Sequence, residues 1–205
     1  HAKGELNVDI LQSVALAAGM AWASGMRLYA VLFLAGAMGH LGYLHLPESL
    51  SALQNPWIMG IAGFLWLIEF LADKIAIVDS LWDSVQGFIR IPAGALLASL
   101  ALGDHDPTLT LAAGLLGGTI TAGTHLAKAG SRALINTSPE PFSNLAASFG
   151  EDALVLSGLW AAIFHPLAFV IALGIFILIL VWLLPRVLSS IRGVWGRLIR
   201  RAPDR

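Results

Sequence analysis

The stretch LAFVIALGIFILILVWLL, residues 167–184, decides the fold class of this chain. It contains no charged residue, and Pro185 follows it directly. A helix needs about 20 predominantly apolar residues to cross the hydrocarbon core of a bilayer. The stretch therefore predicts a transmembrane helix.

The composition of the whole chain agrees with a membrane protein. Of its 205 residues, 57% are hydrophobic and only 12% are charged, whereas soluble domains carry about 25% charged residues. This excludes a water-soluble globular enzyme and a disordered chain. Lys and Arg number 12 against 13 Asp and Glu, so there is no basic excess to bind nucleic-acid phosphates. The absence of Cys excludes disulfides, thiolate metal sites and Cys nucleophiles.

Five further apolar runs of similar length predict further spanning helices. Arg27 lies inside the first, Glu69 lies near the end of the second, and Asp83 and Arg90 lie inside the third. The fourth run is rich in Gly and Thr. We therefore predict an all-α membrane protein with about six transmembrane helices, at residues 14–38, 56–72, 81–102, 107–129, 145–164 and 167–184.

The basic residues outside these runs fall on one side of the predicted membrane. With the N-terminus inside, the outer loops at about 39–55, 103–106 and 165–166 contain no Lys or Arg. Cytoplasmic loops retain these residues. We therefore predict a multi-pass protein of the bacterial inner (plasma) membrane with both termini cytoplasmic. The inner segments then carry Lys3, Lys74, Lys128, Arg132 and the arginines of the C-terminal tail.

The chain divides into one transmembrane domain, residues 1–185, and a short tail. The tail, residues 186–205, reads RVLSSIRGVWGRLIRRAPDR and places apolar residues at helical spacing with Arg between them. Such a basic amphipathic helix binds to an anionic membrane surface. We expect it to lie on the inner leaflet.

Two pairs of segments suggest internal symmetry. ASGMRLYA at 23–30 aligns with TAGTHLAKA at 121–129, and PESLSAL at 47–53 aligns with PEPFSNL at 139–145. The offsets are similar and the order is the same. The alternative explanation is that Gly-rich helices packed closely together resemble one another.

A duplication would have a direct topological consequence. Three predicted spans separate the two copies, so the second copy enters the membrane from the opposite face, as in inverted-repeat transporters. We predict two inverted three-helix repeats, about 8–103 and 107–185. Glycines such as Gly25 and Gly123 permit broken helices. The two Pro-Glu segments predict either re-entrant hairpins or capped helix starts.

Acidic residues are most concentrated in EFLADKIAIVDSLWDSVQGFIR, residues 69–90. Glu69 and Asp73 are four residues apart, as are Asp79 and Asp83, so each pair shares a helix face. Carboxylate oxygens bind Ca²⁺, Mg²⁺ or Mn²⁺, and crowded carboxylates also attract protons. These four are the candidate metal ligands. For Asp73 and Asp79, a salt-bridged helical hairpin at the lipid headgroups is the alternative.

Charged groups inside apolar runs are candidates for substrate binding. Each costs roughly 2.5–3.5 kcal/mol or more in a span, and such residues are usually functional. A pair between Arg90 and Asp83 is not expected, because seven residues separate them. We expect the partner of Arg27 to come from another helix, with Glu69, Asp83, Glu151 and Asp152 as candidates. The candidate substrate-binding residues are Glu69, Asp83, Arg27, Arg90, His125 and Lys128.

The sequence contains no pattern typical of hydrolytic enzymes. There is no HExxH, no phosphate-binding loop and no GxSxG. The cluster GDHDP, residues 103–107, is predicted to be a solvated turn. We therefore predict that the chain is not an enzyme.

The motifs ASGMRLYAVLFLAG and EFLADKIAIVDSLWDSVQGFIRIPAGALL carry a family resemblance over roughly residues 10–185. The chain resembles a group of bacterial integral membrane proteins known only as a domain of unknown function, which implies a polytopic helical fold. It is also similar, more weakly, to inverted-repeat cation/proton exchangers with the signature Glu-x-Gly-Asp-Lys. Glu69-Phe-Leu-Ala-Asp73-Lys74 has one residue more than that signature and no Gly.

These observations together predict a small secondary transporter of a cation or protonatable solute, which works by alternating access and exchanges its substrate for protons. The alternatives are an ion channel or lipid-translocating protein, and an assembly or structural factor that does not transport. We expect no cofactor other than a bound cation. The expected partners are the lipid bilayer, a small ion or solute and a second copy in a homodimer, with no nucleic acid.

Overall fold

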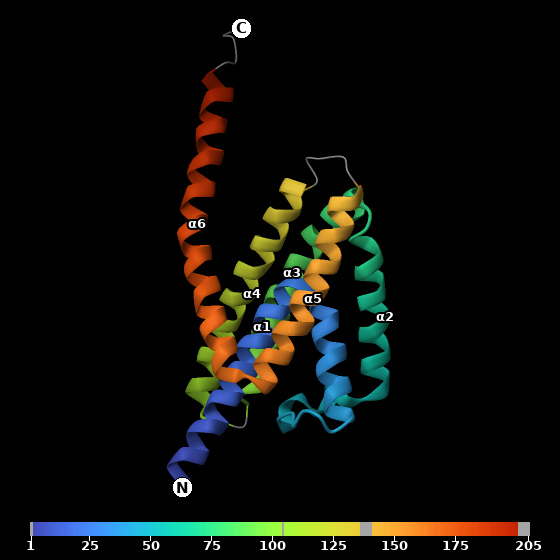
Figure 1. The fold of residues 1–205 in the computed structure, drawn as a ribbon, viewed down its shortest axis with the longest axis vertical. Helices are drawn as coiled ribbons and strands as arrows, with labels where there is room; N and C mark the ends of the chain where they lie inside the picture. The colour runs from blue at the N-terminus through green and yellow to red at the C-terminus, as the bar shows by residue number, and fades with distance from the viewer. Residues whose placement is uncertain (1, 104, 136–140, 201–205) are drawn as a thin grey trace. The chain divides into compact units, whose positions relative to one another are not determined.

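The computed structural model describes residues 2–103, 105–135 and 141–200. Within these ranges the chain is entirely helical and contains no strand (Figure 1). This confirms the predicted all-α class. The elements are α1 (Ala2–His40), the 3₁₀ helix η1 (Glu48–Gln54), α2 (Pro56–Ala72), α3 (Ala76–Ala101), α4 (Pro107–Ile135), α5 (Pro141–Phe164) and α6 (Pro166–Arg200).

The chain forms two compact units. The first, His1–Val170, contains α1 to α5, and the second, Ile171–Arg205, contains most of α6. In the first unit, α1 packs against α2, α3, α4 and α5, so α1 is its central element. The side chains on which the amphipathic tail prediction depends lie outside those that the structure describes.

Four helical segments in the described residues are long and apolar enough to cross a membrane. They are Ile10–His40, Leu81–Ala101, Phe142–Phe164 and Pro166–Leu183. A fifth arises if η1 and α2, which are bent by 69° to each other, are counted as one span. The predicted number of six is not reached, because Gly and Thr lower the hydropathy of α4 although it has 29 residues.

The longest helix, α1, reverses direction at Arg27. This residue has φ −145° and ψ 75°, which are not helical values, between two helical segments. Before the reversal, α1 runs antiparallel to α5, since Gly19 lies against Ala162 and Arg27 bonds to Ser148. After it, α1 runs back along α2.

The contacts of the second segment confirm the return path. Phe33 packs against Trp66 with ring centroids 5.7 Å apart, and Gly36 lies against Met59. Arg27 itself pairs with Asp73, directly after the end of α2. Contacts therefore move toward the start of α2 as α1 proceeds, and Figure 1 shows α1 rising from the N-terminus to a bend and then descending on the other side of it.

The reversal brings both ends of α1 to the same end of the first unit. A cavity of about 460 Å³ is lined by Gln12 and Ser13 and also by Tyr43 and His45. A straight helix over residues 12–40 would separate these groups by about 40 Å. The predicted topology has residues 14–38 cross the membrane once, with a break permitted at Gly25, and places the N-terminus and the 39–55 loop on opposite faces. The structure instead places the start of α1 beside that loop.

Close packing supports the turn. A Cβ atom at Gly25 would lie 2.7 Å from Cβ of Thr124 and 2.6 Å from the carbonyl oxygen of Thr121, so only glycine allows α1 to approach α4 this closely. The Nζ of Lys128 donates to the carbonyl oxygen of Met26 at 3.4 Å. This bond partly satisfies a carbonyl that the interrupted helix leaves free.

The matched segments that suggested an inverted repeat do not behave as inverted copies. Thr121 donates to the carbonyl oxygen of Ala21 at 2.8 Å, and Lys128 bonds to Met26, so the two segments run parallel. The break at Arg27 also has no counterpart in the continuous helix around His125. The two segments are parallel neighbours in closely packed helices. This agrees with the alternative explanation, that the small residues needed for close packing make the segments similar.

The first Pro-Glu segment forms η1, and Leu50 within it is buried. Ser49 does not cap this helix; its hydroxyl donates to the carbonyl oxygen of Leu100 at 2.5 Å. Asn55 caps α2 instead, because its side chain accepts from the N–H of Trp57 at 2.9 Å. Most of the second segment's loop, residues 136–140, lies outside the described residues.

The reversal can be tested by labelling single cysteines, because the chain has none of its own. Membrane-impermeant maleimide should label Ile10→Cys and Tyr43→Cys from the same side of a vesicle, and Lys74→Cys from the other side. Tyr43 is 68% exposed, which makes it a suitable reporter. Labelling of Ile10→Cys and Tyr43→Cys from opposite sides would show that α1 crosses the membrane once without turning.

Candidate functional site

Ten charged side chains from five helices meet beside the reversal of α1, and we call this group the charge cluster. Nine of its members are buried, and the tenth, Asp152, is partly buried with its side chain 13% exposed. Six of the ten are acidic and four are basic. The charge cluster consists of Arg27, Glu69, Asp73, Asp79, Asp83, Arg90, Lys128, Arg132, Glu151 and Asp152.

Arg27 connects three helices from the apex of α1. Its Nη1 lies 2.5 Å from Oδ2 of Asp73, at the end of α2. Its Nε lies 3.0 Å from Oδ1 of Asp152, and its Nη2 donates to the hydroxyl of Ser148 at 3.2 Å, both on α5. Its Nη2 also lies 3.7 Å from Oε2 of Glu151. Of the partners predicted for Arg27, Glu151 and Asp152 are confirmed, whereas Asp73 was not among them.

Arg90 connects α3 to α2. It donates to Glu69 and, at 2.8 Å, to Oδ1 of Asp83. The prediction that Arg90 and Asp83 do not pair was wrong, because the long Arg side chain bridges the two helical turns between them. Arg90 Nη1 also lies 3.4 Å from Nδ1 of His125 on α4, so this predicted residue contacts the charge cluster.

Lys128 and Arg132 add the contribution of α4. Lys128 Nζ lies 3.1 Å from Oδ1 of Asp83, and 3.6 Å from both Oδ2 of Asp73 and Oε2 of Glu151. Arg132 donates from Nε to Oε1 of Glu151 at 2.7 Å and from Nη2 to Oε2 at 3.0 Å. This is a bidentate pair, the strongest geometry for a guanidinium and a carboxylate.

Neither oxygen of Asp79 has a hydrogen-bond partner, and the same is true of Asp73. Asp73 lies 2.5 Å from Arg27, however, so Asp79 is the carboxylate of the charge cluster with the most distant cation. It is fully buried, and its basic neighbour Arg132 is 4.0 Å away. Asp79 precedes the apolar span Leu81–Ala101. Burial raises the pKa of Asp79 to about 6, and the charge of Arg132 offsets this only in part.

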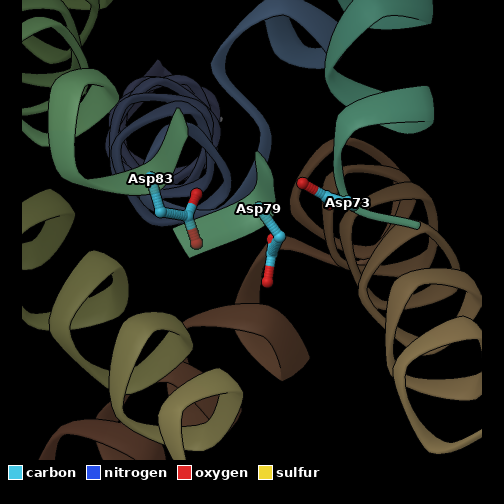
Figure 2. A group of neighbouring side chains, drawn as sticks. All are labelled: Asp73, Asp79 and Asp83. Carbon is cyan, nitrogen blue, oxygen red and sulfur yellow. The ribbon is translucent and has the colours of Figure 1, made fainter. Parts of the chain in front are cut away.

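Three aspartates approach one another at the junction of α2 and α3 (Figure 2). One carboxylate oxygen from each of Asp73, Asp79 and Asp83 lies within 4.8 Å of the other two. Glu69, the fourth predicted ligand, is not one of this group. It is engaged by Arg90 instead. Asp73 and Asp79 are both 0% exposed and form ion pairs with Arg27 and Arg132.

The structure brings every predicted site residue into or against the charge cluster, and it adds others. From the sequence, Arg132 was used only to predict topology, and Asn144 was not a predicted site residue; its side-chain oxygen accepts a hydrogen bond from Arg132. The sequence did contain a pattern that pointed to Arg132 as a site residue. His125, Lys128 and Arg132 recur at helical spacing and are all buried on α4, so one face of this helix carries the basic groups.

Removal of Arg27 should destabilise the fold strongly. Arg27→Met leaves Asp73 and Asp152 buried without their nearest cation, and loss of one partner of a buried ion pair costs about 3–5 kcal/mol. Thermal unfolding in detergent should show this as a large fall in Tm. Lys74→Met is the control, because Lys74 is only partly buried and pairs with aromatic rings rather than with the cluster. Equal Tm values for the two variants would contradict the role of Arg27.

Asp79 should make stability depend on pH. Its folded pKa of about 6 exceeds the ordinary value of 3.8, so the protonated side chain favours folding. That contribution is complete below about pH 3.8 and is lost as pH rises through 6. Asp79→Asn should therefore raise Tm at pH 8 in chelator-treated buffer. It should also reduce the fall in Tm that the wild type shows between pH 4 and 7. If the dependence of Tm on pH is the same in the variant and the wild type, ionisation of Asp79 does not destabilise the fold.

Comparison with known proteins assigns the chain to a family. A family model described as a domain of unknown function (DUF4126) matches residues 14–186. No curated protein and no solved structure matches the chain. The matched range contains all ten residues of the charge cluster and the reversal of α1. It covers most of the 205 residues, so the chain belongs to the DUF4126 family.

Proposed function

We propose that the chain is a small secondary transporter of a cation or protonatable solute, with the charge cluster as its central site. The observation that carries this proposal is a buried, unbalanced group of charges inside a membrane protein. Ionised groups in the apolar interior of a membrane are costly and are typical of ion pathways and proton relays. Such a site suits a charged substrate.

The imbalance indicates the sign of the substrate. Six carboxylates and four basic groups give the charge cluster a formal charge of −2. His125 does not offset this charge when it is neutral. One divalent cation, two monovalent cations or two protons would restore neutrality. A site that alternates between such occupants is the simplest basis for cation/proton exchange.

The reversal of α1 supports alternating access. Transporters commonly build their sites from interrupted helices, whose ends place free backbone groups beside the substrate. In this chain the interruption falls on Arg27, and the carbonyl of Met26 beside it bonds to Lys128. Movement of this apex relative to α5 would open the cluster without unfolding either helix. The burial of the charges corresponds to an occluded state.

The charges of the loops suggest an orientation in the membrane. The end of the first unit that carries Lys74 also holds the charge cluster, whereas residues 41–55 and 103–106 contain no Lys or Arg. By the preference of basic residues for the cytoplasm, the end with Lys74 faces inside. The start of α1 then faces outside, contrary to the both-termini-inside prediction. We propose the bacterial inner membrane as the location.

The ion pairs also favour a second candidate function. Arg27, Arg90 and Arg132 each contact at least two carboxylates, as in an inert network that fixes helix positions. On this alternative the chain is a membrane assembly or structural factor, and its exposed apolar helices bind other spans. A flux measurement separates the two functions.

The transport proposal predicts flux through purified protein in proteoliposomes. Imposed gradients of Na⁺, K⁺, Ca²⁺, Mg²⁺ and Mn²⁺ should reveal saturable uptake of one of them, with an opposing pH change inside the vesicles. Asp79→Asn should reduce the initial rate at least tenfold. The control is Asp106→Asn, since Asp106 lies in an exposed turn and caps α4 through the N–H of Thr108, a role that Asn also fills.

Absence of flux for every cation and for protons, with correctly folded protein, would favour the structural factor. Flux that does not saturate and is unaffected by the Asp79→Asn substitution would favour a pore.

A further inference from the structure

We infer that Asp73, Asp79 and Asp83 form a binding site for one divalent hard cation of about the size of Ca²⁺. The three come from the end of α2 and the first two turns of α3, which are separated only by a short turn. The three aspartates are close in sequence, and Asp79 and Asp83 are four residues apart on one helix. Their carboxylates therefore come together through local structure alone. The site is therefore defined by one helical hairpin.

The spacing of the oxygens suits such an ion. Three atoms that all lie within 4.8 Å of one another have a common point no more than about 2.8 Å from each of them. Ca²⁺ takes oxygen ligands at about 2.3–2.6 Å, whereas Mg²⁺ requires about 2.0–2.1 Å in a strict octahedron. A small inward movement of the side chains satisfies Ca²⁺. The contraction needed for Mg²⁺ is larger.

A second, independent observation is that each aspartate keeps a buried oxygen without a partner. Both oxygens of Asp73, both oxygens of Asp79 and Oδ2 of Asp83 are buried and make no hydrogen bond. The basic groups contact one oxygen of each residue, namely Oδ2 of Asp73, Oδ2 of Asp79 at 4.0 Å and Oδ1 of Asp83. Buried polar atoms are normally satisfied. One unsatisfied oxygen on each of three neighbouring carboxylates is the arrangement expected of a cation site.

The charge balance favours a divalent ion. The formal charge of −2 on the charge cluster is neutralised by one such ion, with the ion pairs of Arg27, Arg90 and Arg132 intact. Lys128 is the nearest competitor, since its Nζ lies 3.1 Å from Asp83 and 3.6 Å from Asp73. Binding of the cation would shift Lys128 toward Glu151, which is also 3.6 Å away.

The claim that the bound cation is also the transported substrate rests on the proposed function. The claim that the three aspartates bind a cation does not. The test is isothermal titration of the chelator-treated full chain in detergent with Ca²⁺, Mg²⁺, Mn²⁺ and Na⁺. One Ca²⁺ should bind per chain, at least tenfold more tightly than Mg²⁺. Asp79→Asn should weaken Ca²⁺ binding at least tenfold, and Asp106→Asn should leave it unchanged.

Asp79→Asn is the decisive variant because its side chain makes no hydrogen bond that the substitution would remove. Folding of each variant is checked by its unfolding transition. A Tm increase on addition of Ca²⁺ to the wild type, absent in the variant, gives an independent readout. No divalent binding by the folded wild type, or equal binding by Asp79→Asn, overturns the inference.

The flux assay separates the two proposals. Ca²⁺ binding that is lost in Asp79→Asn, without flux of any ion, supports the site and refutes the transporter. Saturable flux of Na⁺ or protons, with no divalent binding, supports the transporter and refutes this site.

Discussion

Burial of Arg27 is the constraint on which the arrangement of the helices depends. Its side chain is fully buried, and a guanidinium remains charged in a protein. It must therefore be surrounded by carboxylates and hydrogen-bond acceptors. Asp73 supplies one from the end of α2, and Ser148 and Asp152 supply others from α5. One cation thus fixes the relative positions of three helices. Lys128 and Arg132 of α4 also contact Asp73, and Lys128 contacts Asp83 of α3.

The reversal of α1 is what allows one residue to meet these demands. A residue in the middle of a straight helix presents its side chain to one side only. At an apex, both the side chain and the adjoining backbone face the next layer of helices. Arg27 therefore reaches α2 and α5, while the carbonyl of Met26 accepts from α4. Gly25 makes this possible, because it lets the apex approach Thr121 and Thr124 closely.

The sequence predicted the helices and the charged residues well, but not the path of the chain. Apolar runs identified membrane helices, and four-residue spacing correctly grouped Asp79 with Asp83 on one buried face. Gly25 indicated that the helix can break here, but the reversal of the chain after the break was not predictable, because ASGMRLYA contains no Pro and its residues are also compatible with a continuous helix. The inverted repeat followed from counting spans, and one missed turn changes that count. Pairing across helices, such as Arg132 with Glu151, depends on tertiary contacts that no local pattern contains.

The distribution of unsatisfied groups distinguishes a site from a purely structural network. Well-packed hydrophobic residues often stabilise a protein as much as a buried ion pair or more, so stability alone does not explain ten buried charges. A structural network is expected to be balanced and fully paired. Here buried atoms without a hydrogen-bond partner occur on Arg27, Arg90, Glu69 and Asp152, and five further ones are carboxylate oxygens of Asp73, Asp79 and Asp83. The presence of five such oxygens on three neighbouring carboxylates favours an additional cation at this place.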